Sequence, residues 1–380
     1  MNRGDRVNEK VKVTLTAKMK IMPSTEQADQ LLRTLRAYRL ASNFVSQLVF
    51  ETKTLSILSL HKRMYRELRA TFALRSQMAQ SVMKTVVARY KSLISNRHPW
   101  VSIDFKKPEY DLVWHRDYSL RKDKFSINTL EGRIQVPYET KGMEAYFDGS
   151  WTFGTAKLIH KRGKFFLHIP MTKDTETTTQ ASIQDVVGID LGINFVATSY
   201  DTEGKSTFYP GRPVKDKRSK YKHMRRELQQ VGTPSSRRKL KWIGEREHRW
   251  MTDINHRISK ALVHRYGPHT LFVLEDLTGV RKATERVRVK DRYETVSWSF
   301  YQLRMMIEYK ALLLGAKTIA VDPRYTSQTC PKCNHKEKAN RDKKRHRFCC
   351  KACGYRSNDD RVAAMNLQRI GMKYIAEVVV

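Results

Sequence analysis

The 380-residue sequence predicts an α+β protein of two or three domains. Three observations lead to this class. Short alternating strands and amphipathic helices fill the first half, apolar strands that end in acids open the second half, and two Cys-x-x-Cys pairs lie near the C-terminus. The first half therefore predicts a small β-barrel with inserted helices, and the second half predicts a separate sheet domain that carries a metal-bound insertion.

The charge balance limits the possible partners. The chain has 73 Lys and Arg against 38 Asp and Glu, a formal net charge of +35. Such an excess repels itself unless a polyanion shares the surface, so we expect nucleic acid contacted at many phosphates. A merely basic or ribosomal-type protein is the alternative. No apolar run approaches the roughly 20 residues of a membrane span, and no targeting segment is evident, so we expect a cytoplasmic protein.

The N-terminal half alternates between strand and helix signals. Residues 11–21 alternate apolar and polar, which predicts a strand within a first segment, 1–22. Ser24 and Gln27 have capping-box spacing, so a helix begins there, and more helix follows from about Leu60 to Leu93. These helices form a module over 23–99. Its many Arg and Lys residues suggest that it faces nucleic acid, although each single one is best explained as a solvated side chain.

Residues 100–171 predict antiparallel β structure. Short alternating runs are separated by turn signals at Glu131-Gly132 and Arg162-Gly163. The first strand, 11–21, is expected to join this sheet, which leaves the helices as an insertion in a barrel. The polar stretch 172–184 is expected to be a linker.

The second half begins with an apolar strand, Val186 to Asp190, and a second strand over 193–200 forms a hairpin with it. Next come a basic helical pair and an apolar strand that ends in Glu275. A helix that Gly315 terminates and a short strand precede the cysteines. The basic helical pair covers 212–265 and the strand that ends in Glu275 covers 271–275. The later helix covers 298–314 and the short strand covers 318–321.

Four cysteines have the spacing of a zinc ribbon. They follow the pattern C-x2-C-x16-C-x2-C, and each C-x-x-C pair can direct two thiolates at one ion. Disulfides are the alternative, but no secretory signal accompanies the pairs. A site closed by four thiolates is structural rather than catalytic. The predicted zinc ligands are Cys330, Cys333, Cys350 and Cys353, with Cys349 as a spare thiol.

Three acids occupy positions typical of an RNase H-like nuclease fold. Asp190 and Glu275 each end an apolar strand, and Asp360 opens the last helix, where Ser357 has the spacing of a cap. Crowded carboxylates need cations, and two Mg²⁺ ions about 3.5–4 Å apart would satisfy them. Asp276 would point to the opposite face by strand alternation. Periodicity does not choose between Asp359 and Asp360.

The motifs G-I-D-L-G-I, L-E-D-L, Y-T-S-Q-T-C-P-K-C, F-C-C-K-A-C-G-Y and D-R-V-A-A-M-N resemble those of the TnpB proteins of insertion sequences. These proteins are compact relatives of the type V CRISPR effector nucleases. The resemblance is specific from Val186 to Ile370 and looser in the N-terminal half. One departure is Val362, where the family pattern has Asn.

Transferred to matching positions, the family's RuvC-like catalytic and magnesium-binding acids fall on Asp190, Glu275 and Asp360. Its zinc cysteines fall on the four named above. The resemblance implies a wedge barrel formed by 1–22 and 100–171, a helical recognition domain over 23–99, and a linker over 172–184. It further implies a RuvC-like nuclease domain over 185–323 and 357–380, with a basic helical insertion at 212–265 and a zinc ribbon at 324–356.

The family resemblance implies an RNA-guided DNA endonuclease that is a monomer in its complex. Guide and scaffold RNA would come from the transposon end, and the protein would read a short motif beside the double-stranded DNA target while base pairing reads the sequence. A nuclease-inactive, RNA-guided repressor and a DNA-strand transferase are the alternatives. Because all three acids are present, nothing marks the chain as an inactive repressor.

Overall fold

The computed structural model describes residues 8–121, 124–140, 142–277 and 300–377. The chain forms two compact units, one of residues 14–173 and one of residues 1–13 with 174–380. The boundaries between them fall within two strands, β1 (Asn8–Ile21) and β8 (Lys164–Thr178). In the described ranges, every helix is too short or too polar to cross a membrane.

The described residues of the first unit include three α-helices, and the predicted start of the first is confirmed. Ser24 caps α1 and forms both hydrogen bonds of the capping box with Gln27. The helix predicted from about Leu60 to Leu93 is present as two helices, because the backbone leaves the helix at Ala73, where φ is 51°. The helices are α1 (Thr25–Thr52), α2 (Ile57–Phe72) and α3 (Ser76–Ser95).

The rest of this unit is β structure, as the alternating pattern predicted. The strand order is β2-β7-β8-β1-β5-β4-β3, with β6 paired to β8. The pairs β2–β7, β7–β8, β1–β5, β4–β5 and β3–β4 are antiparallel. The remaining strands are β2 (Glu109–Leu112), β3 (Tyr118–Leu120), β4 (Lys124–Asn128), β5 (Arg133–Glu139), β6 (Thr152–Phe153) and β7 (Ala156–Lys161).

The stretch 172–184 is more regular than an irregular linker. β8 continues to Thr178, and a short 3₁₀ turn, Gln180–Ser182, follows. The sequence here is polar but rich in threonine, whose branched Cβ favours extended backbone. The polarity of this stretch led to the prediction of a linker. The shape of its threonine side chains favours the strand that the structure has.

A five-stranded mixed sheet forms the centre of the second unit, in the order β11-β10-β9-β12-β13. β9 pairs antiparallel with β10 and β10 with β11, whereas β9, β12 and β13 run parallel. The strand β11 was not predicted. The strands are β9 (Asp185–Asp190), β10 (Phe195–Tyr200), β11 (Ser206–Pro210), β12 (Thr270–Glu275) and β13 (Lys317–Val321).

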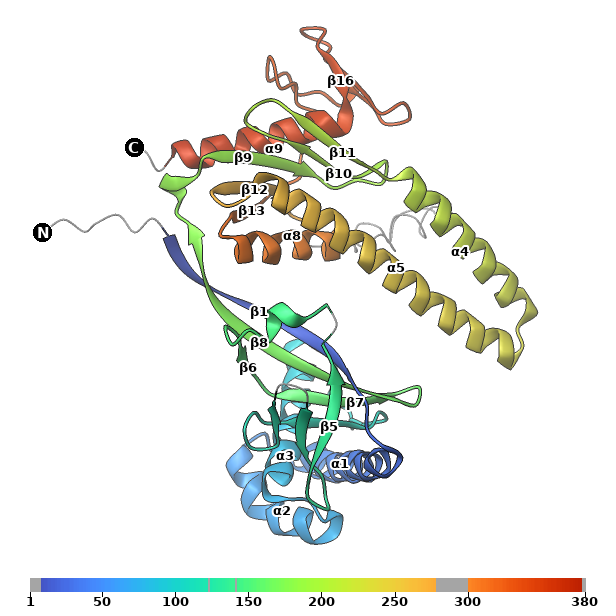
Figure 1. Ribbon diagram of the computed structural model, residues 1–380. Coiled ribbons are helices and arrows are strands. Elements are labelled where there is room, and N and C mark those ends of the chain that lie inside the picture. The colour runs from blue at the N-terminus through green and yellow to red at the C-terminus, as the bar shows by residue number, and fades with distance from the viewer. Residues whose placement is uncertain (1–7, 122–123, 141, 278–299, 378–380) are drawn as a thin grey trace, which may run out of the picture. The chain divides into compact units, whose positions relative to one another are not determined.

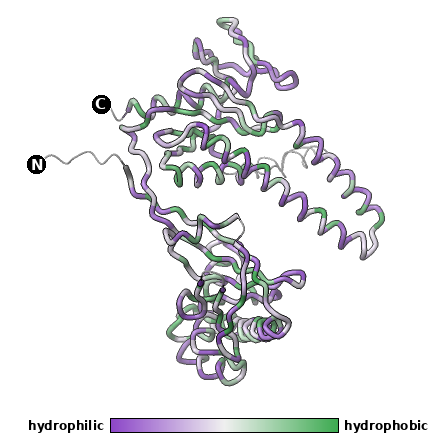
Figure 2. Tube along the Cα trace, in the orientation of Figure 1, coloured by the Kyte–Doolittle hydropathy of each residue, from purple (hydrophilic) through white to green (hydrophobic). Residues whose placement is uncertain are grey.

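Helices cover both faces of this sheet (Figure 1). α9 (Asp359–Ala376) packs on one face over Val186, Leu271 and Val273. On the other face, α5 (Pro234–Tyr266) and α8 (Phe300–Leu314) cover a larger core. The helix α4 (Arg212–Val231) pairs with α5 in a long hairpin that is largely hydrophilic (Figure 2), as the basic pattern predicted. The predicted α8 start at Trp298 lies outside the described residues.

The cysteine segment folds into a small three-stranded antiparallel sheet that joins α9 directly. Its strands are β14 (Arg341–Asp342), β15 (Arg347–Cys349) and β16 (Arg356–Asn358), in that order across the sheet. β16 ends at the residue before α9 begins. The position of the last helix therefore depends on the cysteine segment.

Candidate carboxylate site and cysteine cluster

Strand alternation puts Asp190 and Glu275 on the α9 face of the sheet. Val187 and Ile189 belong to the core under α5 and α8, whereas Val186 belongs to the core under α9. Because successive side chains point to opposite faces, Asp190 falls on the α9 side. On the parallel neighbour β12, Val273 packs under α9, so Glu275 falls on the same side. Both acids thus follow directly from the apolar pattern of their strands.

Glycine at position 188 lets α9 lie directly against β9. A Cβ there would lie 2.1 Å from the carbonyl oxygen of Ala364 and 2.4 Å from the amide nitrogen of Gln368. Gly371, two turns along α9 from Ala364, has the same role, because its Cβ would lie 2.5 Å from Val273. This close approach determines how far the first turn of α9 lies from Asp190.

Asp360 occupies that first turn. The cap of α9 is Asn358, whose side chain accepts hydrogen bonds from the backbone N–H groups of Asp360 and Arg361 at 3.0 and 3.1 Å. The expectation that Ser357 caps the helix is wrong. Ser357 lies in β16, and the chain turns into the helix one residue later.

Two of the predicted acids act electrostatically on the third, Asp190. Burial, followed by the negative charges of Glu275 and Asp360, raises the pKa of Asp190 well above its usual value. Burial also raises the pKa of Glu275. Burial and the charge of Asp359 raise the pKa of Asp360 to about 6. Glu275 and Asp360 therefore lie within electrostatic range of Asp190, and burial disfavours the ionised form of all three carboxyl groups. Among the described residues, the acids whose carboxylate oxygens lie within 4.8 Å of one another and of a histidine nitrogen are Asp359 and Asp360, with His346.

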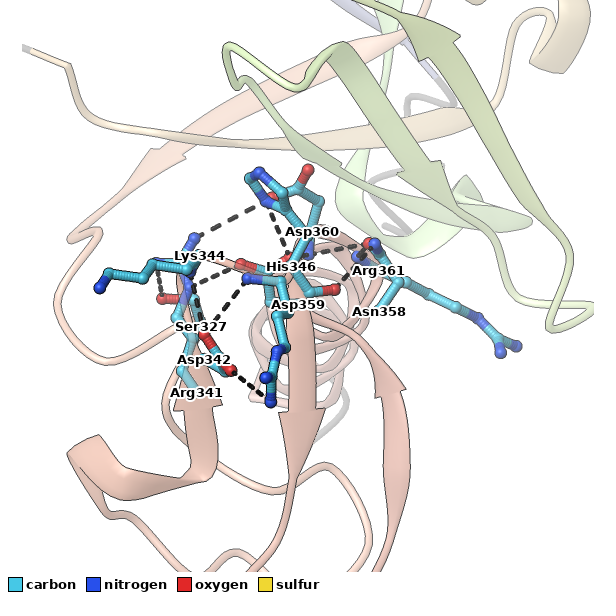
Figure 3. A network of polar contacts seen from close by, with 10 residues as sticks. Ser327, Arg341, Asp342, Lys344, His346, Asn358, Asp359, Asp360 and Arg361 are labelled. Atoms are coloured by element: carbon cyan, nitrogen blue, oxygen red, sulfur yellow. Dashed lines mark hydrogen bonds and ion pairs between the residues drawn. The ribbon is translucent and has the colours of Figure 1, made fainter.

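Three further residues surround these acids, and none of them was singled out from the sequence. The Thr326 hydroxyl donates a 2.7 Å hydrogen bond to Glu275 Oε1. Arg341 donates from Nε to Asp359 Oδ2 at 2.8 Å, and its Nη2 lies 4.0 Å from Asp360 Oδ1 (Figure 3). His346 Nδ1 lies 3.6 Å from Asp359 Oδ1. All three come from the segment between β13 and α9, where no periodic pattern marks them.

The two acids adjacent to the predicted ones have different environments. Asp276 lies on the opposite side, as alternation predicted, and accepts a 2.7 Å hydrogen bond from Arg304 of α8. Asp359 is fully buried and paired with Arg341. Asp360, by contrast, has a buried Oδ2 without a hydrogen-bond partner. An unpaired buried carboxylate oxygen suits a cation.

The four predicted zinc ligands lie together. The Sγ atoms of Cys330 and Cys353 are 3.6 Å apart, and those of Cys333 and Cys350 are 3.5 Å apart. Disulfide sulfurs would be separated by about 2.0 Å. Four sulfurs about 2.3 Å from one ion would lie about 3.8 Å from one another, close to the observed spacing. Cys349 is not part of this cluster.

Each cysteine pair is held by the same backbone turn. The N–H of Cys330 donates to the carbonyl of His335, and the N–H of Cys350 donates to the carbonyl of Tyr355, both at 2.9 Å. Asn334 and Gly354 occupy the left-handed position in these turns, with φ of 60° and 71°. The shared geometry is what directs both thiolates of each pair toward one point.

The cysteine cluster and the start of α9 share a core. Val362 is fully buried against Cys330, Phe348 and Cys350. The side chain of Asn366 donates to the carbonyls of Thr326 and Thr329 at 2.7 and 2.8 Å. The residue that departs from the family pattern thus has an apolar packing role. Asp360 lies on the same short helical stretch as these contacts.

Two family models match the chain. The model described as "Probable transposase" matches residues 168–280, and the one described as "Cas12f1-like, TNB domain" matches residues 300–367. The two matches cover the three acids and the four cysteines.

Curated relatives agree with the family models. The chain is 28% identical over 244 residues to the CRISPR-associated endodeoxyribonuclease Cas12f1 of Sulfoacidibacillus thermotolerans, covering 59% of this chain and 55% of that protein. It is 28% identical over 321 residues to InsQ of Escherichia coli (strain K12), whose name describes an RNA-guided DNA endonuclease, covering 79% and 76%. The chain thus spans about half the length of the Cas12f1 relative.

A solved complex of Cas12f1 with guide RNA and target DNA aligns with 94% of this chain and 99% of its own, with 16% identity and a TM-score of 0.39. A TnpB-like protein of Methanocaldococcus jannaschii is 28% identical over 265 residues, covering 66% of this chain and 91% of that protein. Together, the two family models and the named relatives show that the chain is similar to TnpB-like proteins and to Cas12f endodeoxyribonucleases, which agrees with the resemblance of its motifs to the TnpB family.

Proposed function

We propose that this protein is an RNA-guided DNA endonuclease of a transposable element, which hydrolyses phosphodiester bonds of target DNA next to a short motif. The observation that supports it is that burial raises the pKa of Asp190, Glu275 and Asp360, and that the charges of Glu275 and Asp360, from two other segments, raise the pKa of Asp190 further. Clustered acids with perturbed pKa values are typical of catalytic sites. The named activities of the relatives favour a nuclease over other uses of such a site.

The donor set suits magnesium. Asp190, Glu275 and Asp360 would hold two Mg²⁺ ions, since all three offer hard carboxylate oxygens and Asp360 Oδ2 is buried without a partner. When bound, the metal would supply an activated water and charge stabilisation at the leaving 3′ oxygen. The chain's own part is to hold the carboxylates in position. Thr326 orients Glu275 through its hydroxyl, and Arg341 neutralises Asp359 so that its charge opposes Asp360 less.

The cysteine cluster would hold one structural Zn²⁺. The sulfur spacing and the matched backbone turns support a closed tetrahedral site. Its role would be to stabilise the segment that supplies Thr326 and Arg341 and that packs on Val362. Zinc would therefore act on catalysis through position and not through chemistry.

The domain scheme follows the family. The order β11-β10-β9-β12-β13 supports an RNase H-like, RuvC-type sheet for the nuclease domain, with residues 324–356 as its zinc ribbon. The barrel with its inserted helices would be the wedge and recognition parts. Guide RNA and double-stranded target DNA are the proposed partners, and the net charge of +35 supports binding along many phosphates.

The proposal is tested with Asp190→Ala, using Asp276→Ala as a matched control on the opposite face. Asp190→Ala is expected to abolish Mg²⁺-dependent cleavage of a guide-matched DNA, by at least about 10³-fold, while leaving RNA binding intact. Asp276→Ala should retain cleavage. Continued cutting by Asp190→Ala would refute the proposal. Guide-dependent binding without a product in the unaltered protein would favour the repressor, and joined ends would favour a strand transferase.

A further inference from the structure

Tyr325 has an unusual backbone conformation beside the carboxylate site. Its φ is 67°, in the left-handed region that bulky side chains rarely adopt. Such conformations persist only where the surroundings impose them, and they cluster at functional sites. Tyr325 lies one residue before Thr326, whose hydroxyl is bonded to Glu275.

The surrounding contacts explain how this conformation is maintained. The Tyr325 carbonyl accepts from the N–H groups of Gln328 and Thr329, both at 3.0 Å. On the other side, the N–H of Arg324 donates to Asp322 Oδ1 at 2.9 Å. The Thr326 carbonyl is in turn bound by Asn366 of α9. The turn is therefore fixed at both ends and tied to the helix that carries Asp360.

The side chain of Tyr325 does not serve the core. The residue remains 48% exposed. The ammonium of Lys336 lies 3.1 Å from the ring centroid and covers one face. An isolated antiparallel β-bridge between Lys336 and Thr329 places Lys336 there. Tyr325 thus combines a strained backbone with an exposed ring that has a cation on one face. This arrangement is costly to maintain for packing alone.

We propose that Tyr325 and Lys336 form a nucleobase-binding subsite for an unpaired nucleotide next to the phosphate to be cut. This inference rests on the proposed nuclease function and adds the residues that position its substrate strand. The free face of the phenol ring would stack on a base, and the Lys336 ammonium would lie near the adjoining phosphate. Stacking of this kind requires a base that is not paired, because both faces of a paired base are covered within a duplex.

The subsite is tested by binding, in the non-cleaving Asp190→Ala background of the full chain. The probe is a short single-stranded DNA with 2-aminopurine, whose fluorescence is quenched on stacking. Tyr325→Phe keeps the ring and should bind within about twofold of the parent. Tyr325→Gly should weaken binding about 5- to 150-fold and restore the fluorescence, the range expected for loss of one stacked base.

A second variant and a stability measurement separate stacking from folding. Tyr325→Asn lacks the ring but tolerates the left-handed backbone, so it should lose the same affinity while remaining folded. Tyr325→Gly should raise Tm by about 1–3 °C, because glycine adopts this conformation without strain. Unchanged affinity and quenching in both variants would overturn the subsite. That result would leave the nuclease proposal standing, since Asp190→Ala cleavage tests it separately.

Discussion

Asp359 and Asp360 are adjacent in the chain but have opposite electrostatic environments. One oxygen of Asp359 accepts from the Arg341 guanidinium at 2.8 Å, and the other lies 3.6 Å from Nδ1 of the His346 ring. Asp360 has a buried Oδ2 without a hydrogen-bond partner, and its Oδ1 lies 4.0 Å from Nη2 of Arg341. One acid is thus neutralised within the protein, and the other retains a free coordination position. The start of α9 provides both kinds of acid, because the side chains of its first two residues point toward different neighbours.

The raised pKa of Asp360 predicts how stability changes with pH. Its folded-state pKa of about 6 lies above the usual value of 3.8, so folding opposes ionisation. Its stabilising contribution is complete below about pH 4 and is lost as the pH rises through 6. Asp360→Asn should therefore gain stability relative to the unaltered protein by up to about 1.4 kcal/mol per pH unit over this interval, in Mg²⁺-free buffer.

Chemical denaturation of the two proteins at pH 4.5–7 would measure this difference. Groups that do not interact with Asp360 cancel, whereas Asp190, whose pKa the charge of Asp360 raises, changes the difference in the same direction. Adding Mg²⁺ should reduce the difference in unfolding free energy between the two proteins, because a cation bound at the complete carboxylate site of the unaltered protein would stabilise its ionised form. A stability difference that is independent of pH would contradict the assignment of a raised pKa to Asp360.

At the scale of elements, the contact between α9 and β9 depends on a missing side chain. Gly188→Ala would force Cβ against the backbone of α9, 2.1 Å from the Ala364 carbonyl. We expect a loss of roughly 2–3 kcal/mol in unfolding free energy and a large fall in cleavage, since the helix must move away from Asp190. Gly244→Ala is the control. A Cβ at this position of α5 would lie 3.5 Å from its nearest neighbour, which is an ordinary contact. Gly244→Ala should therefore increase the unfolding free energy by about 0.5–1 kcal/mol. Equal stability of the two variants would refute the tight contact.

The cysteine segment should control the same helix from its other side. Cys330→Ser removes one proposed zinc ligand and disturbs the core around Val362. Because structural zinc supplies roughly 10–16 kcal/mol of folding free energy in small domains, we expect loss of bound zinc, local unfolding and loss of cleavage. Cys349→Ser, outside the cluster, should keep zinc and activity. Metal analysis with limited proteolysis would decide, and unchanged zinc content in Cys330→Ser would contradict the assignment.

Across the whole molecule, sequence reasoning succeeded where one periodic pattern decided the outcome. Alternation along β9 and β12 placed Asp190, Glu275 and Asp276 on their observed faces, and cysteine spacing found the cluster. It failed where competing local signals had similar weight. The α2–α3 break, the extension of β8 through threonines and the Asn358 cap are examples. Thr326, Arg341 and His346 reach the site only through tertiary folding of an irregular segment, which no periodicity describes.

The charge of the whole chain leads to the last prediction. With a net charge of +35, the protein without RNA carries uncompensated repulsion. Binding RNA should relieve it, so RNA should raise Tm, and affinity should fall steeply with salt. If six to ten phosphates are contacted, affinity should drop about 10³- to 10⁵-fold between 50 and 200 mM salt. Because a proposed zinc site and a carboxylate site contribute little to this slope, Asp190→Ala should leave it unchanged. A shallow slope would mean that the basic residues are engaged by the protein's own acids, and the proposed role of the charge in RNA binding would then be wrong.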